Sequence, residues 1–241
     1  MPDDLFAVPR LARVYDDLDP LRHDLAPYLA LVDRCAGRVV VDVGCGTGTF
    51  ACQLALHGKA VVGIDPAPAS LAVARTKTGA ELVRWIESDA TAIPELECDV
   101  VTMTGNVAQV FLDDDEWNQV LRSVHRALHP DGFMIFESRE PSARAWETWS
   151  TTANPAVHDT VAEGRVECWT EVTDVTMPFV SFSHHYVFAA DGAHLVSRST
   201  LRFRSREENE DALEACGFRL TEVRDAPDRP GLENVYIARV S

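Results

Sequence analysis

The sequence predicts an α/β protein with a mostly parallel sheet that carries helices on both faces, followed by an inserted antiparallel sheet. Between Arg38 and Ser138, short β-rich runs alternate with helical stretches, which is typical of βαβ units. Later in the chain, three runs alternate polar and apolar residues with the period of a strand. With 241 residues and 46% hydrophobic content, the chain is long enough to bury roughly 70% of its unfolded surface, so we expect one domain.

The core elements follow one another from the first strand, RVVVDV at 38–43. Its near-continuous valines suit a strand that is buried on both faces. The helix after it ends at Gly58, a residue type that commonly stops helices. The other predicted core elements are strands at 60–65, 81–89, 98–105 and 133–138 and helices at 68–77 and 113–129, with Pro130-Asp131-Gly132 as a turn before the fifth strand.

The pattern changes after the fifth strand. Residues 141–162 read as a polar and aromatic helix or loop, and strands are predicted at 165–175, 181–190 and 194–203, the last two joined by an Asp191-Gly192 hairpin. A helix at 207–216 and a strand pair at 217–225 and 233–240 close the chain. We therefore expect a single domain, 1–241, made of an N-terminal helical arm (1–35), a cofactor-binding core (36–139), an inserted lid and substrate region (140–204) and a closing helix with a strand pair (205–241).

Charge and composition exclude several classes of protein. A formal charge of −16 repels polyanions, so nucleic acid is not an expected partner. The basic stretch RSTLRFRSR at 198–206 is interpreted as a solvated strand face, or alternatively as a groove for an anionic substrate. The six scattered cysteines lack metal-ligand spacing and suggest reduced thiols, with no metal site. No apolar run approaches the ~18 residues of a membrane span, so we expect a cytoplasmic protein without a membrane partner.

The turn in VVVDVGCGTGTF, residues 39–50, carries three glycines that let a ligand approach the backbone. A dinucleotide-binding turn would read G-x-G-x-x-G, but here the third glycine position holds Thr49 and bulky Phe50 follows. Asp42 stands two residues before the first glycine. Its carboxylate would repel a pyrophosphate but could accept hydrogen bonds from an ammonium group or from the amides of the turn. This pattern favours a ligand that carries a positive charge.

With DVGCGTG, this stretch resembles the first motif of class I S-adenosylmethionine-dependent methyltransferases. GID at 63–65, SDA at 88–90, MTGN at 103–106 and LHPDGFMIFE at 128–137 match the later motifs in order, each near a predicted strand end. The resemblance implies a Rossmann-like seven-stranded sheet and S-adenosyl-L-methionine as cofactor. It also implies that Asp65 binds both ribose hydroxyls and that Asp89 contacts the adenine amino group or its neighbours. Taken alone, Asp89 could equally be a helix cap.

The cofactor-binding residues that the resemblance implies lie at the carboxyl ends of the first four strands. They are Asp42, Gly44, Cys45, Gly46, Gly48, Asp65, Pro66, Asp89, Ala90, Thr104, Gly105 and Asn106.

The methyl acceptor is expected to be a small molecule. The Asn/Asp-Pro-Pro-aromatic run of nucleobase amino-methyltransferases is replaced here by TGNVAQVF at 104–111, which contains no thiol. The segment YDDLDPLRHDLAPY at 15–28 resembles the arm that small-molecule methyltransferases fold over the cofactor, with Tyr15 either a lid aromatic or a residue packed on the core. The inserted sheet is similar to that of sugar-amine N,N-dimethyltransferases and glycine N-methyltransferase relatives. A homodimer formed through that sheet is a further expectation.

Methyl transfer depends mostly on positioning the reactants, and a base is needed only when the acceptor must lose a proton. The candidate catalytic residues are Tyr15, Asn106, Glu137 and His184, with Arg139 and His185 as further candidates. Because His184 and His185 are adjacent on a strand, at most one of them can readily reach the pocket. The sequence leaves two other functions open: a nicotinamide-dependent oxidoreductase and a non-catalytic regulator that binds S-adenosylmethionine.

Overall fold

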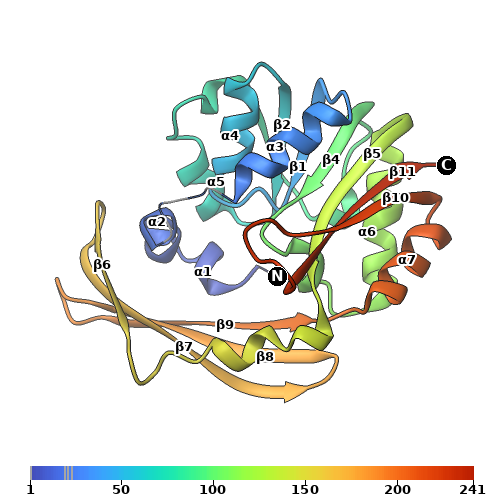
Figure 1. Ribbon diagram of the computed structural model, residues 1–241. Coiled ribbons are helices and arrows are strands. Elements are labelled where there is room, and N and C mark those ends of the chain that lie inside the picture. The colour runs from blue at the N-terminus through green and yellow to red at the C-terminus, as the bar shows by residue number, and fades with distance from the viewer. Residues whose placement is uncertain (1, 19, 21, 23) are drawn as a thin grey trace.

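The chain folds into an α/β sheet with a second, antiparallel sheet beneath it (Figure 1). The computed structural model describes residues 2–18, 20, 22 and 24–241. The larger sheet has the strand order β10-β11-β5-β4-β1-β2-β3. Strands β1 to β5 pair in parallel, whereas β11 pairs antiparallel with both β5 and β10. The predicted fold class is confirmed.

The strands of this sheet are β1 (Val39–Val43), β2 (Ala60–Asp65), β3 (Val83–Glu87), β4 (Cys98–Met103), β5 (Leu128–Arg139), β10 (Phe218–Asp225) and β11 (Glu233–Val240). The helices are α1 (Asp4–Ala7), α2 (Pro9–Leu18), α3 (Leu25–Arg34), α4 (Thr49–Leu56), α5 (Pro68–Ala74), α6 (Asp114–Ala127) and α7 (Arg206–Ala215). Short 3-10 turns are η1 (Ala80–Leu82), η2 (Ala90–Ala92), η3 (Val107–Val110), η4 (Pro141–Ala143) and η5 (Ala145–Thr148).

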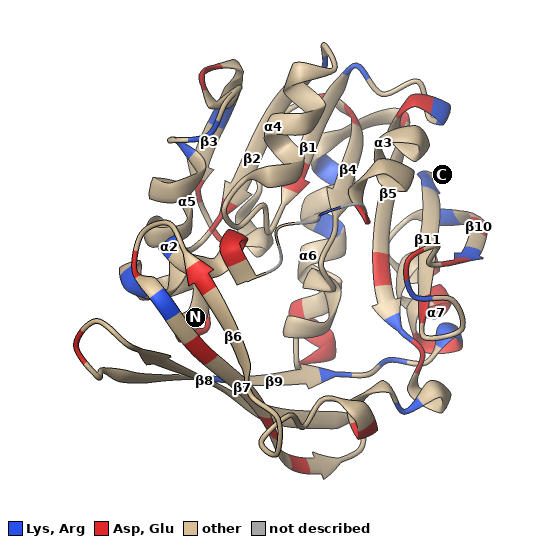
Figure 2. Ribbon diagram, turned by 60° about the vertical axis from the view of Figure 1, so that its left-hand side comes forward, with Lys and Arg blue, Asp and Glu red and all other residues tan. Residues whose placement is uncertain are grey.

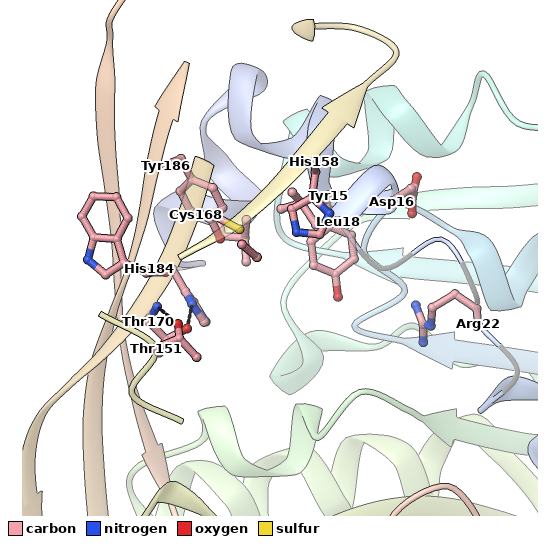
Figure 3. A pocket seen from close by; sticks show the side chains of 13 residues that line it. Tyr15, Asp16, Leu18, Arg22, Thr151, His158, Cys168, Thr170, His184 and Tyr186 are labelled. Atoms are coloured by element: carbon pink, nitrogen blue, oxygen red, sulfur yellow. Dashed lines mark hydrogen bonds between the residues drawn. The ribbon is translucent and has the colours of Figure 1, made fainter. Parts of the chain in front are cut away.

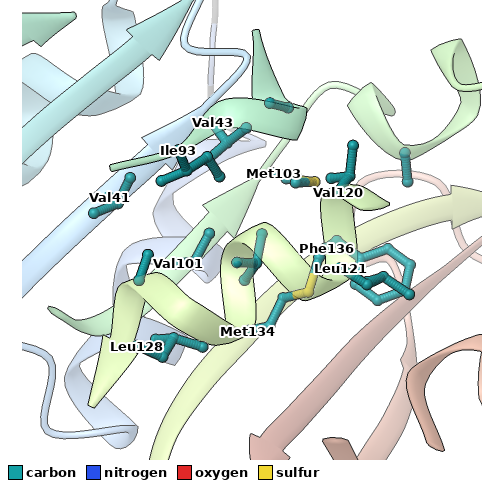
Figure 4. Packing of buried hydrophobic residues seen from close by; sticks show 14 of the residues in the cluster. Val41, Val43, Ile93, Val101, Met103, Val120, Leu121, Leu128, Met134 and Phe136 are labelled. Carbon is teal, nitrogen blue, oxygen red and sulfur yellow. The ribbon is translucent and has the colours of Figure 1, made fainter. Parts of the chain in front are cut away.

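Both faces of the sheet are buried. Successive side chains of its central strands point to opposite faces, and each face packs against an apolar cluster. Val41 of β1 belongs to the cluster that packs against α6, whereas Val40 belongs to the cluster under α3 and α4. Figure 4 shows the first cluster, in which Leu121 of α6 lies against Met134 and Phe136 of β5. The valine-rich strands are therefore held between two apolar layers.

The inserted sheet has four strands in the order β6-β7-β8-β9. They are β6 (Ala156–Thr160), β7 (Gly164–Thr176), β8 (Phe179–Phe188) and β9 (His194–Arg202). The expectation that 141–162 holds only a helix or loop was wrong for β6. This strand has five residues, three of them exposed, and lies at the sheet edge, so it lacks the apolar alternation that marks a strand.

Strand β5 begins earlier than predicted. The structure carries it back to Leu128 through the expected turn, with an irregular register opposite β4 and a positive φ of 72° at Asp131. The irregularity accommodates the proline, which cannot donate a ladder hydrogen bond.

The basic stretch at the end of β9 is joined to the acidic start of α6 (Figure 2). The guanidinium groups of Arg202 and Arg204 lie 2.7 and 3.3 Å from the carboxylate oxygens of Asp114. These two arginines therefore tie the insertion to the core. The expectation of a solvated strand face was wrong for them, because both side chains are largely buried, and their pairing with Asp114 also disfavours a groove for an anionic substrate there. Within the described residues, no helix is both long and apolar enough to cross a membrane, and no group of three His, Cys, Asp or Glu side chains could hold a metal ion.

Phe136 makes aromatic contacts in the core on which the stability of the protein should depend. The ring is fully buried, stacks on Tyr236 at 4.7 Å between ring centroids and meets Trp117 edge-on at 5.6 Å. We expect Phe136→Ala to lower the free energy of unfolding by about 3–5 kcal/mol, because it removes these contacts and leaves a cavity. Urea denaturation measures this, and Leu82→Ala, at a side chain 55% exposed, should change stability by no more than about 0.5 kcal/mol.

Candidate functional site

The candidate site lies at the carboxyl edge of the parallel sheet, where the turn after β1 meets the end of β2. The Asp65 carboxylate accepts the backbone N–H of Gly46 through Oδ2 and that of Ala67 through Oδ1, both at 2.8 Å. Burial raises the pKa of Asp65 despite these bonds. Each oxygen of Asp65 has accepted one bond, so a second acceptor direction on each is available to a ligand.

Two glycines of the turn have different surroundings. Both have positive φ, 54° at Gly46 and 77° at Gly48. A Cβ on Gly48 would come within 2.5 Å of the Trp85 ring and 2.8 Å of Ala74, whereas one on Gly46 would meet nothing within 4 Å. Gly48 therefore allows α4 to pack closely on the sheet, and Gly46 borders open space beside Asp65.

Asp42 does not contribute to the turn in the way that its position in the sequence suggested. It is 2% exposed, and its Oδ1 accepts the hydroxyl of Thr102 at 2.9 Å. Burial raises its pKa to about 7. Among the described contacts, the carboxylate that accepts an amide of the glycine turn is that of Asp65, because the adjacent strand β2 brings it there.

The other predicted cofactor residues have simpler surroundings. Asp89 is exposed and caps η2 by accepting the N–H of Thr91 at 2.8 Å, the helix-cap role that the sequence had left open. Ala90 is buried, Pro66 is exposed, and Cys45 is half-buried with its pKa raised by burial. Any contact of these residues with a cofactor stays a prediction.

The loop after β4 leaves the sheet beside the glycine turn, since β1 and β4 are neighbouring strands. Gly105 and Asn106 both have positive φ, 73° and 62°, and a Cβ on Gly105 would meet nothing within 4 Å. Glu137 Oε1 accepts both of their backbone N–H groups, at 2.6 and 2.9 Å. Thr104, at the start of the loop, is half-buried.

Asp16 of the N-terminal arm contacts the glycine turn. Asp16 of α2 accepts the hydroxyls of Thr47 at 2.7 Å and Thr49 at 3.2 Å, and its Oδ2 lies 2.7 Å from Lys77 Nζ. The resemblance pointed to Tyr15 and missed its neighbour Asp16. Of the arm segment at 15–28, residues 19, 21 and 23 lie outside the described residues.

The other side of the arm is attached to the inserted sheet. Arg10 of α2 pairs with Glu163 and Asp191, both at 2.8 Å, and its guanidinium lies 3.8 Å from the centre of the Phe188 ring. Asp17 accepts the backbone N–H of Val161 at 2.8 Å. The arm therefore bridges the glycine turn and the insertion.

A cleft of about 340 Å³ lies between the arm and the inserted sheet (Figure 3). Tyr15 and Asp16 border it from α2, and Thr170 and His184 border it from β7 and β8. His184 Nδ1 lies 2.8 Å from Thr170 Oγ1, and burial lowers the pKa of His184 to about 4. The cleft thus presents a neutral imidazole whose orientation is set by a hydroxyl group, another contact that sequence spacing does not reveal.

His185 does not share this position. Its ring stacks on Trp169 at 4.8 Å between centroids, and its Nδ1 lies 3.1 Å from His194 Nε2. His185 is not among the residues that line the cleft. The strand periodicity predicted that at most one of the two adjacent histidines could reach a pocket, and His184 lines the cleft while His185 does not.

Known proteins are similar in sequence to the core of this chain. Residues 40–132 match a family model described as a methyltransferase domain. A ubiquinone biosynthesis O-methyltransferase from Pseudomonas syringae pv. tomato is 35% identical over 135 residues, which are 53% of this chain and 55% of that protein. The chain spans about half the length of the curated relatives that it matches.

Solved structures resemble nearly the whole chain. An S-adenosylmethionine-dependent methyltransferase from Clostridium acetobutylicum has a TM-score of 0.78 at 17% identity, covering 96% of this chain and 98% of that chain. An amino pentose methyltransferase from Micromonospora echinaspora has a TM-score of 0.72 at 18% identity, covering 95% of both chains. At these identities the likeness establishes the fold. Residues 40–132 therefore match a methyltransferase domain in sequence, and the chain has the fold of these solved methyltransferases.

The contrast between Gly46 and Gly48 yields a matched pair of variants. Gly46→Ala should strain the backbone by about 1–2 kcal/mol and leave packing intact, while its methyl group enters the space beside Asp65 and weakens S-adenosylhomocysteine binding. Gly48→Ala should lose a further ~1–3 kcal/mol through overlap with Trp85. Urea denaturation and calorimetric titration separate the two effects. Equal losses of stability would contradict this assignment.

The pKa of His184 predicts one contribution to the pH dependence of stability. Between about pH 4 and 6.5 the unfolded state binds a proton at this residue and the folded state does not, so the contribution of His184 to stability rises with pH in this window and is lost as pH falls. We expect His184→Asn to remove this contribution, so that its free energy of unfolding changes with pH by a less positive slope than that of the wild type. Unfolding free energies measured from pH 4 to 7 check this, and an unchanged slope would show that His184 titrates normally in the folded protein.

Proposed function

We propose that this chain transfers a methyl group from S-adenosylmethionine to a nitrogen or oxygen atom of a small molecule. The observation that carries the proposal is the open space at Gly46 beside the Asp65 carboxylate, at the edge of a sheet with the methyltransferase fold. In open α/β sheets, ligands bind in the crevice at the carboxyl ends of the strands.

The residues at this edge fit the cofactor. Asp65 would accept the ribose hydroxyls with its remaining acceptor directions, and Gly46 and Gly105 would let the ligand approach the backbone, since a Cβ at either would meet nothing within 4 Å. Asp42 adds a second buried acid nearby, which favours a cationic ligand. When bound, S-adenosylmethionine supplies an activated methyl group on a positively charged sulfur.

The acceptor would occupy the cleft between the arm and the inserted sheet. Tyr15 would cover it, and His184, held by Thr170, would offer its second ring nitrogen to an N–H or O–H group of the acceptor. Because alignment of two reactants can contribute up to ~7–11 kcal/mol, these residues could promote transfer by positioning alone. The relatives named above include an O-methyltransferase and an amino pentose methyltransferase, and both acceptor atoms remain within the proposal.

Two other functions make different predictions. A nicotinamide oxidoreductase would bind NAD, and Thr49 and Phe50 in the turn disfavour it. A regulator would bind S-adenosylmethionine without turning it over. Calorimetry with S-adenosylmethionine, S-adenosylhomocysteine and NAD distinguishes a methyltransferase from a nicotinamide oxidoreductase. Release of S-adenosylhomocysteine across a panel of small amines, alcohols and phenols distinguishes a methyltransferase from a regulator. Sedimentation would test the predicted homodimer.

Asp65 provides the sharpest test of the cofactor assignment. We expect Asp65→Ala to weaken S-adenosylmethionine binding at least tenfold, or about 1.4 kcal/mol, because it removes the acceptors for the ribose and for Gly46. Asp65→Asn keeps one acceptor oxygen and should lose less. Asp33→Ala, at a carboxylate 61% exposed and remote from the turn, is the control. Unchanged affinity of the Asp65→Ala variant would remove the ribose assignment.

A further inference from the structure

The Glu137 side chain is held by three hydrogen bonds in the interior. Its Oε1 accepts the backbone N–H groups of Gly105 and Asn106, and its Oε2 accepts the hydroxyl of Tyr28 on α3. The residue is 4% exposed, and it does not line the cleft between the arm and the inserted sheet. The Glu137 carboxylate therefore binds the loop after β4 and does not contact the cleft in which an acceptor would lie.

The loop that Glu137 holds is packed on the glycine turn. Gly44 approaches Val107 so closely that a Cβ on the glycine would lie 2.5 Å from a methyl group of Val107. Strands β1 and β4 are neighbours in the sheet, so the two segments leave it side by side. A shift of Gly105 and Asn106 would move Val107 and, with it, the support of the turn.

Three charged side chains and one amide complete the described surroundings of Glu137. Glu233 of β11 is 2% exposed and its Oε1 lies 2.7 Å from Arg229 and 3.2 Å from Arg139, while also accepting the side-chain N–H of Asn106 at 3.1 Å. Two buried carboxylates are thus matched by two guanidinium groups. The loop is therefore held at two groups of Asn106: its side-chain amide donates to Glu233, and its backbone N–H donates to Glu137.

We propose that Glu137 is a positioning residue of the cofactor site: it fixes the loop after β4, and that loop supports the glycine turn through Val107. This inference rests on the proposed function and assigns Glu137 a role other than general base. Burial, with repulsion from Glu233, raises its pKa to about 7, a value that would also suit a base. The geometry decides between the roles, because Glu137 is buried and does not line the cleft, and its Oε1 already accepts two N–H groups.

Replacement of Glu137 by glutamine and by alanine tests the proposal. Glutamine keeps the oxygen that accepts the two amides and offers Tyr28 a donor, so Glu137→Gln should bind S-adenosylhomocysteine within threefold of the wild type. Glu137→Ala leaves the two N–H groups without their acceptor and should weaken binding at least tenfold. Glu147→Ala, at an exposed carboxylate paired only with Arg144 among the described contacts, is the matched control.

The outcomes distinguish this inference from the proposed function. If the wild type does not bind S-adenosylhomocysteine, the proposed function fails. If it binds, and Glu137→Ala binds equally well or Glu137→Gln loses as much affinity as Glu137→Ala, the positioning role is overturned.

If Glu137→Ala does not give a cooperative thermal transition, the Val107→Ala variant takes its place as the test of the positioning role. It leaves the Glu137 contacts in place and should weaken binding at least threefold, and unchanged affinity would overturn the proposal. With an acceptor from the panel, a base would lose kcat in Glu137→Gln, whereas a positioning residue keeps it.

Discussion

The edge of the sheet that carries the candidate site depends on buried carboxylates that accept backbone N–H groups. Loops that leave parallel strands have amides without partners in the sheet, and a buried amide needs an acceptor. Asp65 serves Gly46 and Ala67, and Glu137 serves Gly105 and Asn106. These bonds hold the glycine turn and the loop after β4 in conformations with positive φ, and so they set the shape of the space between the two segments.

The same carboxylates give this edge its electrostatic character. Burial raises the pKa values of Asp42, Asp65 and Glu137, which means that each is costly to hold in its charged form. A cation at the site would lower that cost. The interpretation from the sequence, a ligand with a positive charge, is consistent with this arrangement, although Asp42 contacts Thr102 and leaves the turn to Asp65.

The cleft proposed for the acceptor is assembled from segments that are far apart in the chain. The arm supplies Tyr15 and Asp16, and the inserted sheet supplies Thr170 and His184. Asp16 also accepts hydrogen bonds from Thr47 and Thr49 of the glycine turn, so the wall of the cleft and the glycine turn share one side chain. Displacement of the arm would therefore alter both sites together.

Local patterns in the sequence determined the elements of the core, because backbone hydrogen bonding and side-chain alternation repeat over a few residues. The strand at 60–65 was predicted with its observed bounds, and the glycine turn was recognised, for this reason. Short, exposed β6 lacked such a pattern. The partners of Asp65 and Glu137 were decided only by the tertiary structure: a carboxylate can accept any N–H within reach, and strand order and packing determine which N–H that is. The residue types thus predicted a site of glycines and acids at the strand ends. The hydrogen-bond partners of the individual acids depended on contacts between segments that are distant in sequence.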